Sequence, residues 1–167
     1  EYENGPYFCD NVKKIKQYQY LDKNLSCDIL IIGGGIDGAI ANFYLSFNFD
    51  VALVDKGRLG CCCTACATAL LEYQLDDYAS DLEKTMSKEE IVQAYNMGLM
   101  AIQKISILEK YGNHCEFAFR PTFLFSNSIF SIGKLNKEYL FRKSHGFECE
   151  LFDDQNNPLP FKGSSTI

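Results

Sequence analysis

A glycine-rich turn near the start of the chain has the spacing of a phosphate-binding loop. Six residues form this turn: Gly33, Gly34, Gly35, Ile36, Asp37 and Gly38. Glycines at its first, third and sixth positions permit a tight turn, a close approach of a pyrophosphate to the backbone, and close packing of a helix on a strand. The N–H groups and the positive dipole end of a helix starting here would bind an anion. We therefore expect all six residues to contribute to a dinucleotide site.

An acidic residue follows the turn at the separation that such a site requires. Asp55 lies 22 positions after Gly33, at the end of an apolar run. Its carboxylate can accept hydrogen bonds from ribose hydroxyls, and its charge disfavours a 2′-phosphate. Asp37 carries a second carboxylate at the expected helix start, where we expect it to face solvent or cap the helix. The turn and the acid predict a dinucleotide but do not alone decide between NAD and FAD.

The elements that must position these residues can be read from the apolar pattern. Residues 27–32 are rich in β-branched side chains and apolar on both faces, which predicts a buried strand of a parallel sheet. Residues 39–47 suit a helix, and residues 49–54 repeat the strand pattern. Together these segments predict a strand–helix–strand unit with the glycine turn at the end of its first strand.

A long helix is predicted after this unit. Ser87 and Glu90 have the spacing of a capping box, apolar residues then recur every three or four positions, and Gly112 supplies a stop. The helix is therefore expected over 88–111. The remaining expectations are two short strands, or one strand broken at Pro121, within 116–126; a helix over 135–144; a strand over 147–152; and a loop over the last fifteen residues.

The stretch from Asp28 to Leu71 resembles the N-terminal FAD-binding segment of the amino-acid and amine oxidase family, which includes D-amino-acid oxidase, glycine oxidase and glycerol-3-phosphate dehydrogenase. The resemblance lies in the glycine turn, in the run Val51-Ala52-Leu53-Val54-Asp55-Lys56, and in the small-residue segment from Gly60 to Ala69. It continues more weakly through Arg120-Pro121 and residues 135–152. It implies FAD as the cofactor, and an enzyme that moves hydride from an amino acid, amine or similar small substrate to the flavin.

The resemblance also implies roles for individual residues. Gly33, Gly35 and Gly38 would bind the pyrophosphate, Asp55 the adenosine ribose, and Lys56 would lie beside the adenosine. Cys63, Thr64 and Thr68 would line the path toward the flavin. No catalytic residue can be nominated, because the groups that hold the substrate in this family usually come from a later antiparallel sheet. The expected partners are a small-molecule substrate and a missing C-terminal part of the same protein.

The fold class that follows is α/β, with a Rossmann-like FAD/NAD(P)-binding βαβ unit, a parallel sheet, and the start of an α+β substrate domain. We expect an N-terminal arm over 1–26, the FAD-binding segment with the long helix over 27–112, and the incomplete beginning of the substrate domain over 113–167. The 167 residues and the lack of an initiator Met lead us to expect the front part of a longer flavoenzyme.

Half of the eight cysteines crowd into six residues, and this cluster admits three interpretations. The cluster is Cys61, Cys62, Cys63 and Cys66. The favoured interpretation is that small cysteines fill small-residue positions under the cofactor. The others are a thiol redox pair of Cys63 and Cys66, and a metal or iron–sulfur site. We predict no metal, because four thiolate ligands usually come from two separated pairs.

Composition excludes several classes of protein. A net charge of −6 disfavours nucleic acid as a partner. No run of 18 apolar residues predicts a membrane span, and the absence of a signal-peptide pattern predicts a cytoplasmic setting. Two alternatives to a flavin-dependent oxidoreductase stay open: a catalytically incomplete nucleotide-binding fragment or module, and, less favoured, an NAD-dependent dehydrogenase domain.

Overall fold

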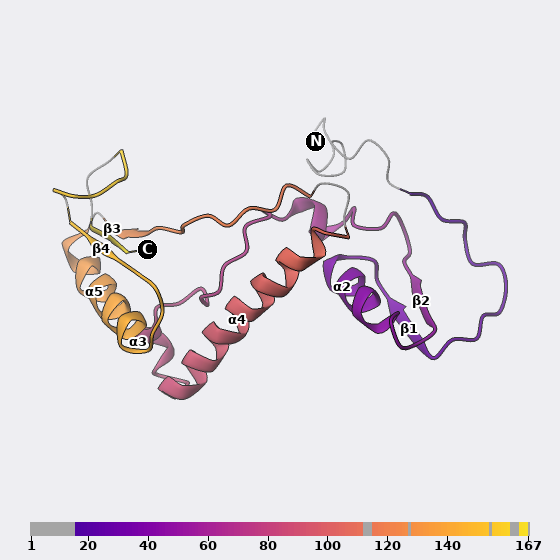
Figure 1. Ribbon diagram of the computed structural model, residues 1–167, viewed down its shortest axis with the longest axis horizontal. Helices are drawn as coiled ribbons and strands as arrows, with labels where there is room; N and C mark the ends of the chain where they lie inside the picture. The colour runs from indigo at the N-terminus through magenta and orange to yellow at the C-terminus, as the bar shows by residue number, and fades with distance from the viewer. Residues whose placement is uncertain (1–15, 112–114, 127, 154, 161–163, 167) are drawn as a thin grey trace. The chain divides into compact units, whose positions relative to one another are not determined.

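The computed structural model describes the chain except for residues 1–15, 112–114, 127, 154, 161–163 and 167. The chain divides into two compact units, Glu1–Leu70 and Leu71–Ile167. The long helix, labelled α4 in Figure 1, belongs to the second unit. The boundaries expected from the sequence, between the arm and the FAD-binding segment after residue 26 and before the substrate domain after residue 112, stay predictions.

The first unit is the expected strand–helix–strand arrangement. Strand β1 (Ile29–Ile32) pairs in parallel with β2 (Val51–Val54), and Ile32 lies opposite Val54. The helix α2 (Ile36–Leu45) connects them and packs on both strands, as Figure 1 shows. The helix begins three residues earlier than predicted, because extended Gly35 serves as its N-cap inside the glycine turn. The α/β class with a Rossmann-like βαβ unit is confirmed.

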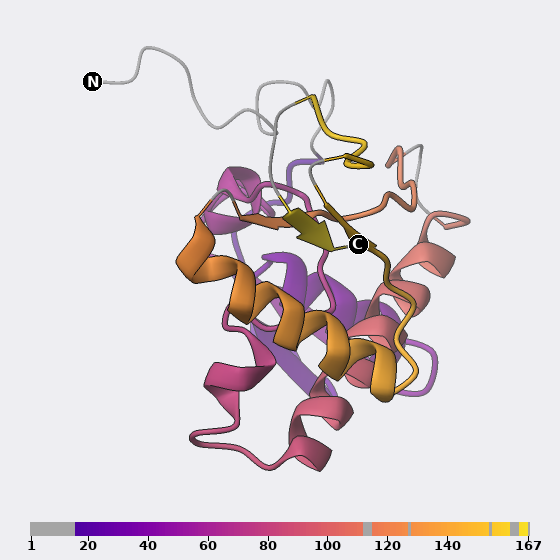
Figure 2. The same ribbon diagram turned by 90° about the vertical axis from the view of Figure 1, so that its left-hand side faces the viewer.

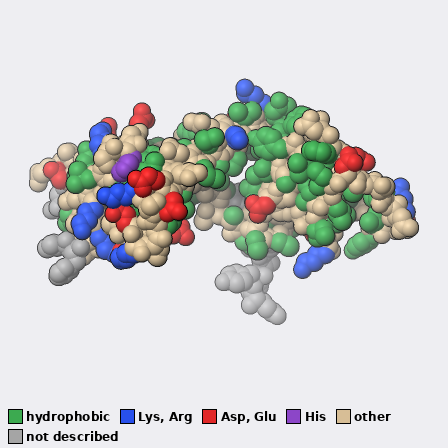
Figure 3. Space-filling model, turned by 90° about the horizontal axis from the view of Figure 1, so that it is seen from below, with side chains coloured by type: hydrophobic (Ala, Val, Ile, Leu, Met, Phe, Trp, Pro, Cys, Tyr) green, Lys and Arg blue, Asp and Glu red, His purple; other side chains and the backbone are tan. Residues whose placement is uncertain are grey.

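One face of this sheet departs from the prediction. Ile29 and Ile31 are half-buried, whereas Leu30 is 55% and Ile32 is 81% exposed. Successive side chains of a strand point to opposite faces, so the described part of the chain covers one face with α2 and leaves these two side chains largely exposed on the other. The expectation that both faces of β1 are buried is therefore wrong for the described residues. In the right-hand part of Figure 3, hydrophobic side chains gather on the surface of this unit.

The second unit begins with α3 (Ala79–Leu82) and α4 (Lys88–Leu108). The capping box that begins α4 is present: the Glu90 N–H donates to the Ser87 hydroxyl, and the Glu90 carboxylate accepts from the Ser87 N–H at 2.8 Å. The predicted helix is thus confirmed at its start. It ends at Leu108, three residues before the expected end, and the expected stop at Gly112 lies outside the described residues.

The last elements form a small antiparallel sheet on a helix. The strand order is β3 (Leu124–Ser126), β5 (Ser164–Thr166), β4 (Leu151–Phe152), and the helix α5 (Ile129–Ser144) packs against β3 and β5. Figure 2 shows β5 as the arrow beside α5. Gly146, with a φ of +83°, follows the helix, in the left-handed conformation that glycine favours at a helix C-terminus.

Four predictions for this region need correction. The segment 116–126 has a strand only over 124–126, and the strand expected over 147–152 is reduced to its last two residues. The helix expected from residue 135 starts at residue 129, and Ser128 precedes it with an extended conformation. The expected C-terminal loop contains β5, the central strand of the sheet. Strand pairing with distant residues, rather than local propensity, determines these short strands.

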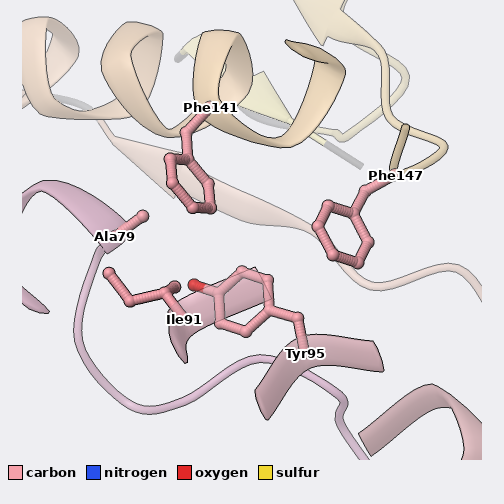
Figure 4. Close-up of a cluster of buried hydrophobic side chains, with 5 residues drawn as sticks. All are labelled: Ala79, Ile91, Tyr95, Phe141 and Phe147. Carbon is pink, nitrogen blue, oxygen red and sulfur yellow. The ribbon is translucent and has the colours of Figure 1, made fainter. Parts of the chain in front are cut away.

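The core of the second unit is aromatic. Ala79, Ile91, Tyr95, Phe141 and Phe147 are buried together, and Figure 4 shows the Tyr95 ring between side chains from α5 and the segment after it. Edge-to-face contacts join Tyr95 to Phe141 and to Phe147, with ring centroids 6.2 and 5.5 Å apart. This cluster packs α3, α4 and α5 together.

A buried ion pair lies at the side of this core. Glu138 is fully buried and Arg142 is 3% exposed, and the Arg142 Nε donates to Glu138 Oε1 at 2.8 Å. The same carboxylate accepts from the Ala79 N–H at 2.6 Å and from the Tyr95 hydroxyl at 3.2 Å. A second guanidinium nitrogen of Arg142 donates to the Tyr73 hydroxyl. Burial, followed by the Glu138 charge, raises the pKa of Tyr95, so this phenol stays protonated and donates.

Among the described residues, no helix has both the length and the apolar character needed to cross a membrane.

Candidate functional site

The glycine turn leaves β1 in a conformation that glycine favours. Gly33 has a φ of +109°, a region that side chains with a Cβ rarely adopt, and its N–H donates to the Val54 carbonyl at 2.8 Å. A Cβ on Gly33 would meet no atom within 4 Å, so the backbone there is open on that side. The turn is therefore tied to the end of β2 while keeping one side accessible.

Gly38 is required by close packing rather than by its dihedral angles. A Cβ at this position would collide with the carbonyl oxygen of Gly33, and the Ile31 side chain lies 3.4 Å away. The first turn of α2 thus lies against the end of β1, as the third glycine of the motif predicts. This contact fixes the start of the helix behind the turn.

The N-terminus of α2 presents several backbone donors. The N–H groups at the start of a helix have no acceptor within the helix, and the first bond of α2 runs from the Ala39 N–H to the Gly35 carbonyl. Gly35 provides no side-chain cap, and Asp37 in the first turn is exposed, as expected. The Ile36 N–H donates to the Thr64 hydroxyl at 3.0 Å. The arrangement suits an anion at the helix start.

Asp55 is joined directly to the glycine turn. Its Oδ2 accepts from the Gly34 N–H and its Oδ1 from the Gly57 N–H, both at 2.7 Å. These two backbone hydrogen bonds, that from Gly34 first, lower the pKa of Asp55, so the group is a carboxylate at neutral pH. Each carboxylate oxygen has a further lone pair after these bonds, so Asp55 can still accept from a hydroxyl.

The other residues expected in the site differ in whether they contact the glycine turn. Thr64 reaches α2 through the bond to Ile36, and its hydroxyl would lie 3.2 Å from a Cβ at Gly35. Lys56, Cys63 and Thr68 are exposed. The Thr68 hydroxyl accepts from the N–H two residues later, at 3.4 Å. In the described residues, Thr64 and Asp55 therefore contact the turn directly, while the roles expected for the other three stay predictions.

Sequence reasoning missed the segment 57–60, which follows Asp55 and contacts the glycine turn. The Gly60 N–H donates to the Gly34 carbonyl at 2.9 Å, and Gly60 has a φ of +72°. A Cβ at Gly34 would collide with the Leu59 side chain. Gly57 supplies the second N–H to Asp55. The available signal was a glycine two residues after the acid and another three residues later.

Two cysteines of the cluster, Cys63 and Cys66, are the first and last residues of a short 3₁₀-helix, η1 (Cys63–Cys66), and Cys62 is its N-cap. Every cysteine of the described part of the chain is a free thiol. No group of three or more His, Cys, Asp or Glu side chains among the described residues is arranged to hold a metal ion.

Comparison with known proteins gives two matches. A family model described as FAD-dependent oxidoreductase (DAO) matches residues 28–163. The chain is 25% identical over 150 residues to the putative Rieske 2Fe-2S iron–sulfur protein YhfW of Bacillus subtilis, a match that covers 89% of this chain and 30% of that protein. The chain therefore spans less than a third of the length of this relative. No solved structure matches significantly.

Proposed function

Because the chain belongs to the FAD-dependent oxidoreductase (DAO) family, we propose that it forms the FAD-binding portion of an enzyme that oxidises an amino acid, an amine or a similar small molecule. The observation that carries the proposal is the hydrogen bond from the Gly34 N–H to Asp55. This bond joins the turn that would bind the phosphates to the carboxylate that would bind the ribose.

The residues of this site fit an adenosine diphosphate group. The pyrophosphate would approach Gly33 and Gly35 and accept hydrogen bonds from N–H groups at the start of α2. The carboxylate of Asp55 would accept from the ribose hydroxyls, and Lys56 would lie beside the adenosine. Gly38 keeps the helix start close to β1. Bound FAD supplies the acceptor for hydride, and the contribution of this chain is to bind and orient it.

A second candidate function is a nucleotide-binding portion without activity of its own. Two observations favour it: the match covers only 30% of the relative, and Leu30 and Ile32 of the sheet are uncovered. Under this alternative the chain binds FAD but oxidises no substrate unless another segment is supplied. Cys63 and Thr68 would then line the path toward the flavin, as in the first candidate.

The test is to titrate the purified chain with FAD, FMN and NAD, following flavin fluorescence for the first two and the thermal transition for NAD. FMN shares the flavin with FAD but lacks the adenosine half. We expect FAD to bind about tenfold more tightly than FMN, or better, because the residues of the proposed site would contact the adenosine diphosphate. Equal binding of FMN, or no binding of FAD by folded protein, would reject the proposal. Preference for NAD would favour the dehydrogenase alternative.

The matched variants are Asp55→Ala and Asp50→Ala. A hydrogen bond to a charged group contributes about 1.5–3 kcal/mol, so loss of the Asp55 carboxylate should weaken FAD binding about tenfold to a hundredfold. Asp50 is also acidic and lies at the opposite end of β2, so its substitution should leave FAD affinity within about twofold. Circular dichroism of both variants would show that the fold is retained.

A further inference from the structure

The structure assigns to Cys63 and Cys66 the role of a thiol–disulfide exchange site on the wall of the glycine turn. The two residues are the first and last of the 3₁₀-helix η1. Backbone bonds of the i to i+3 type define this turn, from the Ala65 N–H to the Cys62 carbonyl at 3.0 Å and from the Ala67 N–H to the Thr64 carbonyl at 3.3 Å. Because a 3₁₀-helix has three residues per turn, the side chains of its first and fourth residues lie on one face.

The spacing suits a disulfide bond. Three steps of about 2.0 Å separate the Cα atoms of Cys63 and Cys66 by about 6 Å along the axis. Disulfides join cysteines whose Cα atoms lie about 4.4–6.8 Å apart. The pair can therefore close without unwinding the turn.

The turn exposes its cysteines and anchors its other residues. Cys63 and Cys66 are exposed, whereas Ala65 is 4% exposed and Thr64 is half-buried with its hydroxyl on the Ile36 N–H. Because a 3₁₀-helix has three residues per turn, Thr64 and Ala65 lie on other faces of η1 than the two cysteines. The thiols are thus open to a reagent from solvent while the turn is held from within.

The neighbouring cysteines are poorer partners. Cys62 is adjacent to Cys63, and a disulfide between adjacent residues is strained. Cys61 is half-buried, and its N–H donates to the Arg58 carbonyl at 3.3 Å. Among the described cysteines of this cluster, the i, i+3 pair alone combines a shared face with exposure of both residues.

The reagent we infer is a small disulfide such as oxidised glutathione. The thiolate of one cysteine attacks the small disulfide, which breaks its S–S bond, releases one small thiol and leaves a mixed disulfide. The thiolate of the second cysteine attacks this mixed disulfide and releases the second small thiol. The two protein thiols are oxidised to one disulfide, and the small disulfide is reduced to two thiols.

Closing this bond affects the glycine turn through Thr64. The threonine lies inside the closed loop, and its hydroxyl accepts from the N–H of Ile36, the first residue of α2. A cross-link that restricts the loop opposes the local opening that would separate these two groups. The oxidised chain should therefore hold the start of α2 more firmly than the reduced chain.

The test is to equilibrate the reduced chain with glutathione buffers from fully reduced to fully oxidised, quench with acid, block free thiols with iodoacetamide and map the bond by fragmentation mass spectrometry. Trypsin leaves the whole cluster in one peptide, from Leu59 to Lys84. We expect a bond between Cys63 and Cys66, with Cys61 and Cys62 alkylated. Mixed disulfides without this bond, or a bond through Cys62, would overturn the assignment.

Two variants and one exchange measurement sharpen the result. Cys66→Ser should leave Cys63 as a stable mixed disulfide with glutathione, whereas Cys62→Ser, an exposed neighbour, should retain the internal bond. Hydrogen exchange at the Ile36 amide should slow severalfold on oxidation of the unsubstituted chain. Unchanged exchange there would overturn the coupling to α2. None of these readouts requires FAD, so their failure is distinct from failure of the proposed function.

Discussion

Asp55 and Glu138 each accept a hydrogen bond from a backbone N–H near the start of a helix, and they lie in opposite environments. Asp55 is half-buried, and its described partners are the N–H groups of Gly34 and Gly57. Glu138 is fully buried and accepts from the Ala79 N–H, the Tyr95 hydroxyl and Arg142. The first carboxylate keeps access for a ligand, while the second is enclosed by protein donors.

The difference separates a carboxylate that is proposed to bind a ligand from a carboxylate that stabilises the fold. A buried charge needs a partner of opposite charge and further hydrogen bonds, because removing it from water is costly. Glu138 has both, so its donors are committed to holding α3, α4 and α5 together. Asp55 has neutral backbone donors and remains accessible, so a bound molecule can add to its hydrogen bonds. Substitutions at the two positions should therefore fail in different ways.

The largest effect is expected from Glu138→Ala. This change leaves the Arg142 guanidinium buried without its charge partner and removes the acceptor for the Ala79 N–H. Breaking a buried pair by removing one member costs about 3–5 kcal/mol. Urea unfolding, followed by circular dichroism, should show this decrease in the free energy of unfolding of the second unit, whose core contains Tyr95.

The matched control is Glu148→Ala, because Glu148 is exposed and lies in the same unit. It should change the free energy of unfolding by no more than about 0.5 kcal/mol. Equal losses for the two variants would show that the enclosed network of Glu138 does not stabilise the second unit. Hydrogen exchange should also show that Glu138→Ala leaves the protection of β1 and β2 largely unchanged.

The contrast between the two carboxylates also marks what could be predicted from the sequence. The placement of Gly33, Gly38 and Asp55 at one turn follows from local spacing, because a turn, a strand end and a helix start are close in sequence. Glu138 gave no such signal, since its partners Ala79 and Tyr95 are 59 and 43 positions away. Strand β5 was missed for the same reason: its pairing partners β3 and β4 determine it. Leu30 and Ile32 read as buried because an apolar strand does not reveal how much of its sheet the chain covers.

A smaller effect is expected from Gly38→Ala. This change tests the glycine turn beside the accessible Asp55, whereas Glu138→Ala tests the buried network of the second unit. The new Cβ would collide with the Gly33 carbonyl oxygen, so α2 must move away from β1. Overpacking of this kind costs about 1–3 kcal/mol. Hydrogen exchange should show faster exchange in β1 and α2, with the protection of α4 unchanged.

Gly133→Ala is the matched control for this change. Gly133 is exposed within α5, and a Cβ there would meet no atom within 4 Å. Replacing glycine by alanine inside a helix stabilises it by about 0.5–1 kcal/mol. Opposite signs for the two glycine substitutions are the expected result, and destabilisation by both would refute the close-packing role of Gly38.

The smallest effect concerns Asp81, a third carboxylate, which is held by charges at the surface. Its two oxygens accept from Lys84 and Lys134 at 2.6 and 2.8 Å, and the hydrogen bond from Lys134, followed by that from Lys84, lowers the pKa of Asp81 to about 2. A lowered pKa means that the carboxylate stabilises the fold above its ordinary pKa of 3.8. This contribution should be lost as the pH falls from about 4 through about 2, and Asp81→Asn should flatten that part of the stability profile.

Salt should separate Asp81 from Asp55. The pKa of Asp55 is lowered chiefly by the uncharged N–H groups of Gly34 and Gly57, whereas that of Asp81 is lowered by two exposed lysines. Salt screens interactions between exposed charges, with a Debye length of about 3 Å at 1 M. Carboxyl titration by NMR in low and high salt should therefore move the pKa of Asp81 upward toward 3.8 and leave that of Asp55 nearly constant. Equal upward shifts would mean that the pKa of Asp55 is lowered by charge, and that backbone donors do not distinguish the proposed binding carboxylate from the surface one.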